Sequence, residues 1–234
     1  MFAASQRNLR PEPTIVLFPH KTLFRRTALA LLALGLGAAI AEPAFAAATP
    51  ERTVDMATVL QPGPLPELVA GDPKGVTVVE YGSLTCPHCA AFNRDVFPKL
   101  KANYIDNGKV KYIFREFSRN PLDVAAFILA RCVGDDKALA TIDLLFASQD
   151  KWAFVENPLE PLITAVRPTG LSHDAAMACL KDPAKAEAMQ KIVKTAVDVV
   201  KVQGTPTFVI DGKVYGGELT MEDFDKILAP LINK

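Results

Sequence analysis

The sequence predicts an α/β domain interrupted by a block of helices. Two runs of β-branched and aromatic residues, 76–81 and 110–117, flank a segment with helical periodicity. Helical patterns alone follow over residues 118–200, until a strand at 206–210, an Asp211-Gly212 turn and a last helix complete the chain. Strand–helix–strand, several helices, then a hairpin and a helix is the order expected for helices inserted into an α/β sheet.

The composition is that of a folded chain with a sizeable core. Its 234 residues include 26 basic and 26 acidic side chains, and half of all residues are apolar. A formal net charge of zero gives no electrostatic reason to expect nucleic acid as a partner. Four cysteines are too few for a small disulfide-stapled scaffold, so their positions matter more than their number.

Residues 1–46 have the pattern of a secretory signal peptide. Basic residues up to Arg26 precede an uncharged, Ala- and Leu-rich run over 27–41, and small residues define a cleavage site before Ala47. The alternative is a membrane anchor, but the apolar run is shorter than the roughly 20 residues that span a bilayer. The Arg25-Arg26 pair leaves twin-arginine export open. We therefore expect a mature, mildly acidic chain in an oxidising compartment.

The most informative motif is Cys86-Pro87-His88-Cys89, which lies between the first strand and its helix. A helix N-terminus carries free N–H groups and a positive partial charge, which stabilise a thiolate and lower its pKa. Pro87 suits the first helical position, where no amide hydrogen is needed. His88 is expected to add a donor or a positive charge beside the Cys86 sulfur. Stabilising the reduced form makes a cysteine pair an oxidant.

Other chemistry at this pair has less support. A structural zinc site needs four ligands, but residues 47–234 contain only His88, His173 and no second Cys-x-x-Cys. A Cu(I) carrier needs only two thiolates and stays open. Predicted export, motif and helix start agree on thiol–disulfide chemistry, which needs no metal and no dissociable cofactor.

Two segments resemble the DsbA family of periplasmic thiol:disulfide oxidoreductases. They are Val79-Glu-Tyr-Gly-Ser-Leu-Thr-Cys-Pro-His-Cys89 and Gly204-Thr-Pro-Thr-Phe208. The likeness covers about residues 60–234 and looks closest to alphaproteobacterial members. It implies a thioredoxin fold over 73–117 and 201–234, an inserted helical domain over 118–200, and an extended leader over 47–72.

The resemblance also implies roles for single residues. Cys86 would be the exposed nucleophile and Cys89 its buried partner. Pro206 would be a cis-proline facing the disulfide, with the backbone of Thr205 free to pair with an extended substrate. Glu80 matches a buried acid that assists proton transfer, whereas the residues alone leave open a solvated carboxylate at a strand edge.

The activity expected from motif and resemblance is oxidation of reduced, unfolded exported proteins in the periplasm. The resemblance implies reoxidation by a DsbB-like, quinone-linked membrane protein. The alternatives are a disulfide isomerase or reductase, and a non-enzymatic Cu(I)-binding or holdase protein. The short segment before the first strand favours a monomer and an oxidase, whereas Thr205 also precedes the cis-proline in isomerases.

Cys132 and Cys179 lie in the predicted helical block without a local motif. A structural disulfide, two separate buried thiols and a second redox pair are the alternatives. Export favours the structural disulfide, and related alphaproteobacterial proteins carry such a pair. Closing this loop would stabilise the fold by roughly 4 kcal/mol on the chain-entropy model. We also consider that the bond tunes the active pair.

Three further side chains have structural expectations. Arg115 and Glu116 interrupt the apolar pattern of the second strand and predict a solvated ion pair. Trp152 predicts a residue that fills a gap between helices.

Overall fold

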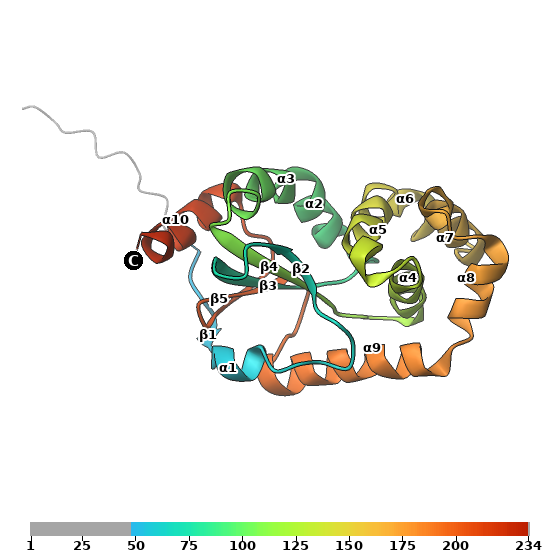
Figure 1. Cartoon of the computed structure of the whole chain (residues 1–234), viewed down its shortest axis with the longest axis horizontal. Helices are drawn as coiled ribbons and strands as arrows, with labels where there is room; N and C mark the ends of the chain where they lie inside the picture. The colour runs from blue at the N-terminus through green and yellow to red at the C-terminus, as the bar shows by residue number, and fades with distance from the viewer. Residues whose placement is uncertain (1–47, 234) are drawn as a thin grey trace, which may run out of the picture. The chain divides into compact units, whose positions relative to one another are not determined.

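The structure is a computed structural model, and it describes residues 48–233. Its centre is a six-stranded sheet in the order β1-β6-β5-β3-β4-β2 (Figure 1). The strands are β1 (Arg52–Thr53), β2 (Leu68–Gly71), β3 (Val76–Gly82), β4 (Val110–Glu116), β5 (Thr207–Ile210) and β6 (Lys213–Gly216). Strands β3 and β4 run parallel, whereas β5 and β6 form a hairpin antiparallel to β3. This α/β arrangement confirms the predicted fold class.

The crossover from β3 to β4 is helical and broken near Pro98. Helix α2 (Pro87–Asp95) ends one residue before α3 (Phe97–Leu100), which continues into the π-helical turn η1 (Lys101–Ile105). Proline at the second position of α3 cannot donate to the preceding turn, which explains the break. Phe92 on α2 packs against Phe208 of β5, with ring centroids 4.8 Å apart, and so fixes the helix on the sheet.

Helices fill the interval between β4 and β5. They are α4 (Pro121–Cys132), α5 (Asp135–Ala147), α6 (Gln149–Trp152), α7 (Leu159–Val166), η2 (Arg167–Thr169), α8 (His173–Leu180), α9 (Pro183–Thr195) and η3 (Ala196–Val200). Helix α4 is buried along most of its length, because most of its residues are apolar. Trp152 is fully buried and its indole N–H donates to the carbonyl of Leu145 at 2.9 Å, which confirms its packing role.

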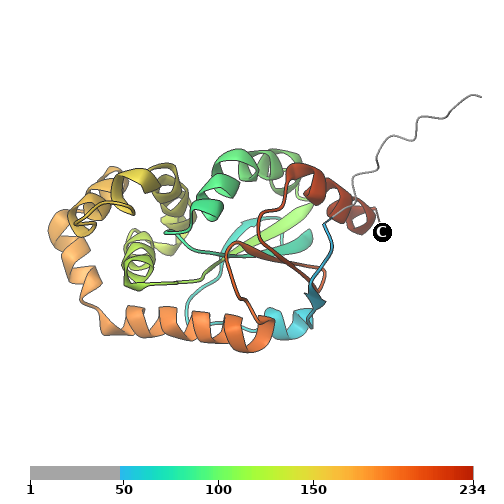
Figure 2. The same ribbon diagram turned by 180° about the vertical axis from the view of Figure 1, so that it is seen from behind.

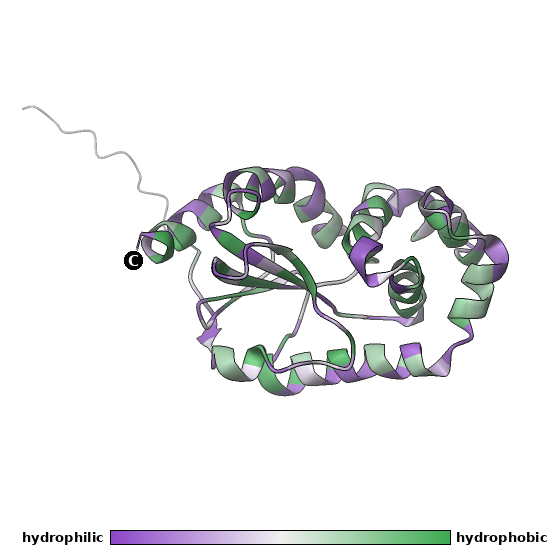
Figure 3. Ribbon diagram, in the orientation of Figure 1, coloured by the Kyte–Doolittle hydropathy of each residue, from purple (hydrophilic) through white to green (hydrophobic). Residues whose placement is uncertain are grey.

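Helix α9 leads the chain back from these helices toward the sheet, and the last helix is α10 (Met221–Ile232) (Figure 2). The strands of the sheet are mostly hydrophobic, whereas α9 alternates between hydrophobic and hydrophilic residues (Figure 3). One apolar core extends from the sheet into the helices, because Phe114 of β4 contacts Phe127 of α4 and Phe146 of α5.

Residues 47–72 are more than the extended leader that we expected. From residue 48 on, they supply two edge strands, since β1 pairs with β6 and β2 pairs with β4. Helix α1 (Met56–Val59) lies between them, capped by the carboxylate of Asp55. Strands of two and four residues are too short to leave an alternating pattern, and their pairing is set by partners far along the chain.

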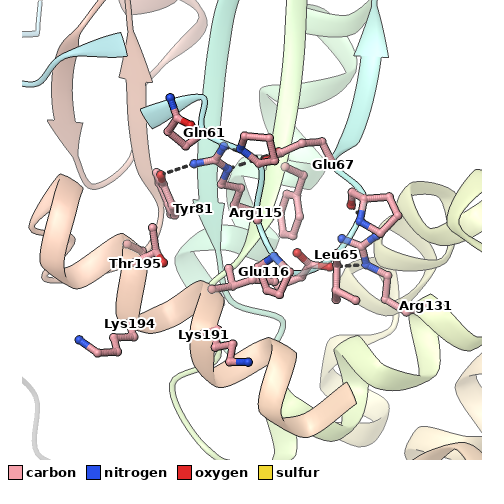
Figure 4. Close-up of a pocket in the computed structure, with 17 residues that line it drawn as sticks. Gln61, Leu65, Glu67, Tyr81, Arg115, Glu116, Arg131, Lys191, Lys194 and Thr195 are labelled. Carbon is pink, nitrogen blue, oxygen red and sulfur yellow. Dashed lines mark hydrogen bonds and ion pairs between the residues drawn. The ribbon is translucent and has the colours of Figure 1, made fainter. Parts of the chain in front are cut away.

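Arg115 and Glu116 do not form a solvated pair, and that expectation was wrong. The Arg115 guanidinium contacts the carboxylate of Glu67 at 2.8 Å and the hydroxyl of Tyr81 at 2.9 Å. Glu116 is only 2% exposed and accepts a hydrogen bond from Arg131 at 2.5 Å (Figure 4). Residues 61–67 and α9 line an open cavity of about 460 Å³ at this end of the sheet, and both charges find partners on other elements.

Candidate active site

The Cys-Pro-His-Cys motif lies where β3 passes into α2. Cys86 is the N-cap residue of α2, and its carbonyl accepts the first helical hydrogen bond from Ala90 at 3.1 Å. Pro87 occupies the first turn, as predicted. The Cys86 sulfur lies beside the backbone N–H groups of His88 and Cys89 at the start of the helix.

Cys86 is a free thiol, but it is 2% exposed rather than the exposed residue that we expected. Its Sγ lies 3.2 Å from the carbonyl oxygen of Thr205, so the loop before β5 covers it, whereas Pro87 and His88 are exposed. The pKa of Cys86 is lowered to about 5 by a hydrogen bond from the Cys89 thiol, by Thr205, and by the backbone N–H groups of Cys89 and His88. Burial of the thiol opposes this shift.

Cys89 is a fully buried free thiol with the opposite shift. Burial, its hydrogen bond with Cys86 and the charge of Glu80 raise the pKa of Cys89 well above its ordinary value. The backbone N–H of Ser83 points to the Cys89 sulfur at 3.5 Å and partly offsets that rise. The two cysteines therefore form an asymmetric pair, with one thiolate and one thiol at neutral pH.

The peptide bond between Thr205 and Pro206 is cis. This geometry places the Thr205 carbonyl over Cys86, while the Pro206 carbonyl accepts a hydrogen bond from the Gly217 N–H at 2.9 Å. The hydroxyl of Thr205 is buried, and its interaction with Cys86 contributes to the lowered pKa of that thiol. The structure thus brings together the motif cysteines and the Thr205-Pro206 pair, although they are more than a hundred residues apart in sequence.

His88 supplies the expected donor to Cys86 from its backbone, while its ring contacts a different segment. Its ring is largely exposed, and Nδ1 lies 2.5 Å from a carboxylate oxygen of Glu218, in the segment between β6 and α10. The contribution of His88 to the Cys86 pKa comes from its backbone N–H. The sequence pattern did not single out Glu218, because nothing local links that segment to the motif.

Glu80 lies on the central strand β3 and is 1% exposed, so the solvated alternative is wrong. The hydroxyl of Tyr112 on β4 donates to its carboxylate at 2.6 Å. Burial raises the pKa of Glu80 to about 8, while the Tyr112 hydrogen bond opposes that rise. Glu80 is therefore mostly a neutral acid at pH 7, buried near the Cys89 thiol. The sequence pattern did not indicate Tyr112, whose apolar neighbours make it look like an ordinary core residue.

Two residues of the helical block contact the loop before Cys86. They are Asp123 at the start of α4 and Gln149 at the start of α6, and both are buried. Neither belongs to a motif, so sequence patterns gave no reason to select them.

Cys132 and Cys179 are joined by a disulfide, with Cα atoms 6.4 Å apart. The bond links the end of α4 to α8. Cys86 and Cys89 are free thiols, so the four cysteines fall into two separate pairs.

Residues 48–233 also bear on the expected metal chemistry and membrane attachment. Over that range, no group of three or more His, Cys, Asp and Glu side chains is arranged to hold a metal ion. No helix there combines the length and hydrophobicity needed to cross a membrane. The predicted signal peptide, residues 1–46, lies outside the described residues.

Comparison with known proteins agrees with this geometry. A family model described as thioredoxin matches residues 65–229. A provisionally named protein-disulfide oxidoreductase of Rickettsia felis is 36% identical over 148 residues, which cover 62% of this chain and 53% of that protein. This chain therefore spans about half the length of such Rickettsia relatives. A Bacillus anthracis protein, provisionally named disulfide bond formation protein D, is 30% identical over 162 residues, 67% of this chain and 72% of the relative.

Solved structures show the same fold. Alpha-DsbA1 of Wolbachia pipientis has a TM-score of 0.69 and 29% identity over 75% of this chain and 94% of its own. BdbD of Bacillus subtilis, in its oxidised form, has a TM-score of 0.63 and 21% identity over 81% of this chain and 100% of its own, a likeness of fold alone. The thioredoxin-like sheet, the inserted helices and the Cys-Pro-His-Cys helix start thus place the chain in the thioredoxin family, among its DsbA-like members.

Proposed function

We propose that the protein is an exported thiol:disulfide oxidoreductase that introduces disulfide bonds into reduced, unfolded proteins through Cys86 and Cys89. The observation that carries this proposal is the placement of two free thiols at one helix start, with Cys86 as the N-cap residue and Cys89 fully buried one turn later. The pKa of Cys86 is lowered to about 5, and that of Cys89 is raised by burial. A stabilised Cys86 thiolate favours the reduced pair, which makes the disulfide form an oxidant.

The exchange proceeds in two steps from the oxidised pair. A substrate thiolate attacks the Cys86 sulfur, a new sulfur–sulfur bond forms, and the Cys86–Cys89 bond breaks with its electron pair on Cys89. A second substrate thiolate then attacks the substrate's own sulfur in the mixed disulfide. Cys86 leaves as a thiolate, a good leaving group because of its low pKa. Two electrons pass from the substrate to the pair, and the substrate gains one disulfide.

Glu80 supplies the proton that Cys89 needs in the first step. Its carboxyl is buried beside the pair and, with a pKa of about 8, is largely protonated at neutral pH. The Cys89 thiolate is costly to leave charged in this buried position, so a neighbouring acid lowers the barrier to its departure. Tyr112 holds the Glu80 carboxylate through its hydroxyl.

The backbone beside Pro206 is the proposed substrate-binding element. In this reduced form the Cys86 sulfur lies 3.2 Å from the Thr205 carbonyl oxygen and occupies the position of a partner to that carbonyl. Once Cys86 is bonded to a substrate sulfur, that carbonyl is free to accept an N–H from an extended chain. Backbone pairing of this kind is independent of substrate sequence, which suits unfolded proteins.

Export, reoxidation and domain limits belong to the same proposal. The signal peptide at 1–46 would direct the chain to the periplasm, where it would act as a monomer and be reoxidised by a DsbB-like, quinone-linked membrane protein. The helical domain would extend over 118–200, between the two parts of the thioredoxin-like domain.

The test is catalysis by the oxidised protein with a reduced, unfolded two-thiol substrate. We expect the protein to form the substrate disulfide in one turnover. Cys86→Ser should abolish the reaction. Cys89→Ser cannot form the pair disulfide, but when it is mixed with the substrate in its disulfide form, the Cys86 thiolate should attack that bond and accumulate a mixed disulfide, with the second substrate sulfur leaving as a thiolate. His173→Ala, a change of an exposed side chain in α8, is the matched control and should react as the unaltered protein does. A protein that only reshuffles scrambled disulfides in its reduced state would be an isomerase, and the oxidase proposal would then fail.

A further inference from the structure

The loop between β3 and the catalytic helix is held by hydrogen bonds from distant side chains. Residues 83–85 belong to neither the strand nor the helix, so their polar groups need partners from elsewhere. Both Ser83 and Leu84 are fully buried, which makes the need stronger. The partners come from the first turn of α4 and from the start of α6.

Asp123 binds the loop on one side. One carboxylate oxygen accepts the backbone N–H of Thr85 at 2.8 Å. The other accepts the Ser83 hydroxyl at 2.7 Å and the N–H of Arg119 at 2.9 Å. Asn120, the N-cap of α4, adds a bond from its amide to the Thr85 hydroxyl at 2.8 Å. The beginning of the inserted helices is thus tied to the residues that precede Cys86.

Gln149 binds the same segment by donating hydrogen bonds to two of the backbone carbonyl groups there. Its amide Nε2 donates to the carbonyl of Leu84 at 2.7 Å and to that of Cys86 at 3.1 Å. The side chain is buried, and its helix is anchored three residues later by the fully buried Trp152. A buried amide with two acceptors in place has little freedom to move, so it fixes the Cys86 backbone.

The loop in turn positions backbone groups around the two cysteines. The Ser83 N–H points at the Cys89 sulfur, while the Ser83 carbonyl accepts the Cys86 N–H at 3.1 Å. A shift of this loop would move both the donor to Cys89 and the start of α2, whose amides face Cys86. Side chains 40 and 65 residues further along the chain therefore determine the geometry at the cysteine pair.

We propose that Asp123 and Gln149 are positioning residues for disulfide exchange, which hold residues 83–86 in the geometry that makes Cys86 reactive. Neither touches a reacting sulfur; each acts through the backbone of the loop. The inserted helices then help to set the geometry of the active site, in addition to packing next to it. This inference rests on the proposed function, because it assigns the setting of the same Cys86–Cys89 pair.

The test measures the pKa of Cys86, from thiolate absorbance, and the equilibrium constant with glutathione in purified variants. Gln149→Leu removes both donated bonds and should raise the Cys86 pKa by about half a unit or more, with a threefold or larger change in the equilibrium constant. Asp123→Ala should act in the same direction. Asp123→Asn keeps an oxygen that accepts from Thr85 and an NH₂ that can donate to the Ser83 hydroxyl, but this NH₂ faces the Arg119 N–H donor, so its behaviour should lie between that of Asp123→Ala and that of the unaltered protein.

Thr141→Val is the control for a general loss of stability, because it also removes a hydrogen bond of a buried side chain. Thr141 is 1% exposed on α5, and its hydroxyl bonds only to the carbonyl of Lys137 in the same helix. This variant should leave both readouts unchanged. Ser83→Ala is a smaller change that removes one bond to Asp123. If Asp123→Ala does not fold, Ser83→Ala tests the same contact and should shift both readouts in the same direction. Folded Gln149→Leu and Ser83→Ala proteins with unaltered pKa and equilibrium constant would overturn the inference. Both readouts need no protein substrate, so they separate this inference from a failure of oxidase activity.

Discussion

Cys86 and Cys89 are the same residue type three positions apart, yet their surroundings drive their pKa values in opposite directions. Cys86 is the helix N-cap residue, with donors from Cys89, Thr205 and the backbone around its sulfur. Cys89 is one turn further into the helix, fully buried and near the carboxyl of Glu80. Position on the helix thus assigns the roles of leaving thiolate and buried thiol, which composition alone leaves open.

Replacing Glu80 tests whether its buried carboxyl group keeps its proton at neutral pH. The folded-state pKa of Glu80 is raised from 4.5 to about 8, so the folded protein keeps a proton that the unfolded chain loses between these values. In protein whose Cys86 and Cys89 are joined as a disulfide, so that neither thiol titrates, this group should therefore lower the stability of the native protein as pH rises from about 4.5 to 8, by an amount on the order of 4 kcal/mol. Glu80→Gln should lack that part of the decline, as measured by urea unfolding from pH 4 to 9.

The exposed Glu187 on α9 provides the comparison for Glu80. Glu187→Gln should keep the pH dependence of the unaltered protein, because this carboxylate lies at the surface beside Lys191. Equal pH dependence in Glu80→Gln and the unaltered protein would show that Glu80 ionises normally, contrary to the proton-transfer role.

Local pattern predicted the chemistry of the site but not its surroundings. The Cys-x-x-Cys spacing, Pro87 and a preceding strand are sufficient to locate a reactive pair at a helix start. The burial of Cys86 and the placement of the His88 ring depend on Thr205 and Glu218, which lie more than a hundred residues away. Such contacts leave no trace in a local window, and the same is true of Asp123 and Gln149.

At the scale of elements, long segments with a clear period were predicted well and short ones were not. The period or apolar character of α4, α5 and α9 is visible because each has at least twelve residues. Strands β1 and β2 contain two and four residues and were missed, since their existence depends on β6 and β4 beside them. Arg115 failed as a predicted surface charge because residues 61–67 cover it.

The Cys132–Cys179 disulfide should stabilise the helical block through the loop that it closes. With a sequence separation of 47, the chain-entropy model gives a stabilisation of roughly 4 kcal/mol. The Cys132→Ser, Cys179→Ser double variant should lose most of it, as measured by urea unfolding with Cys86–Cys89 oxidised in both proteins. A loss under about 1 kcal/mol would mean that the bond contributes little to the fold.

At the scale of the molecule, one core joins the sheet to the inserted helices. The site is assembled from both, since the cysteines and cis-proline come from the thioredoxin-like elements and Asp123 and Gln149 from the insertion. The order of elements along the chain predicted this division. It did not predict that the insertion would reach the catalytic loop, because that contact depends on how the helices pack against the end of β3.

The central claim is that Cys86 and Cys89 form an oxidising pair. Its most direct test is the reduction potential of this pair at pH 7, measured by equilibration with glutathione buffers of known ratio. The structure predicts a potential less negative than about −200 mV, because the reduced form is stabilised through the Cys86 thiolate. A potential near the −270 mV or so of a reducing thioredoxin would contradict the claim and identify the protein as a reductant.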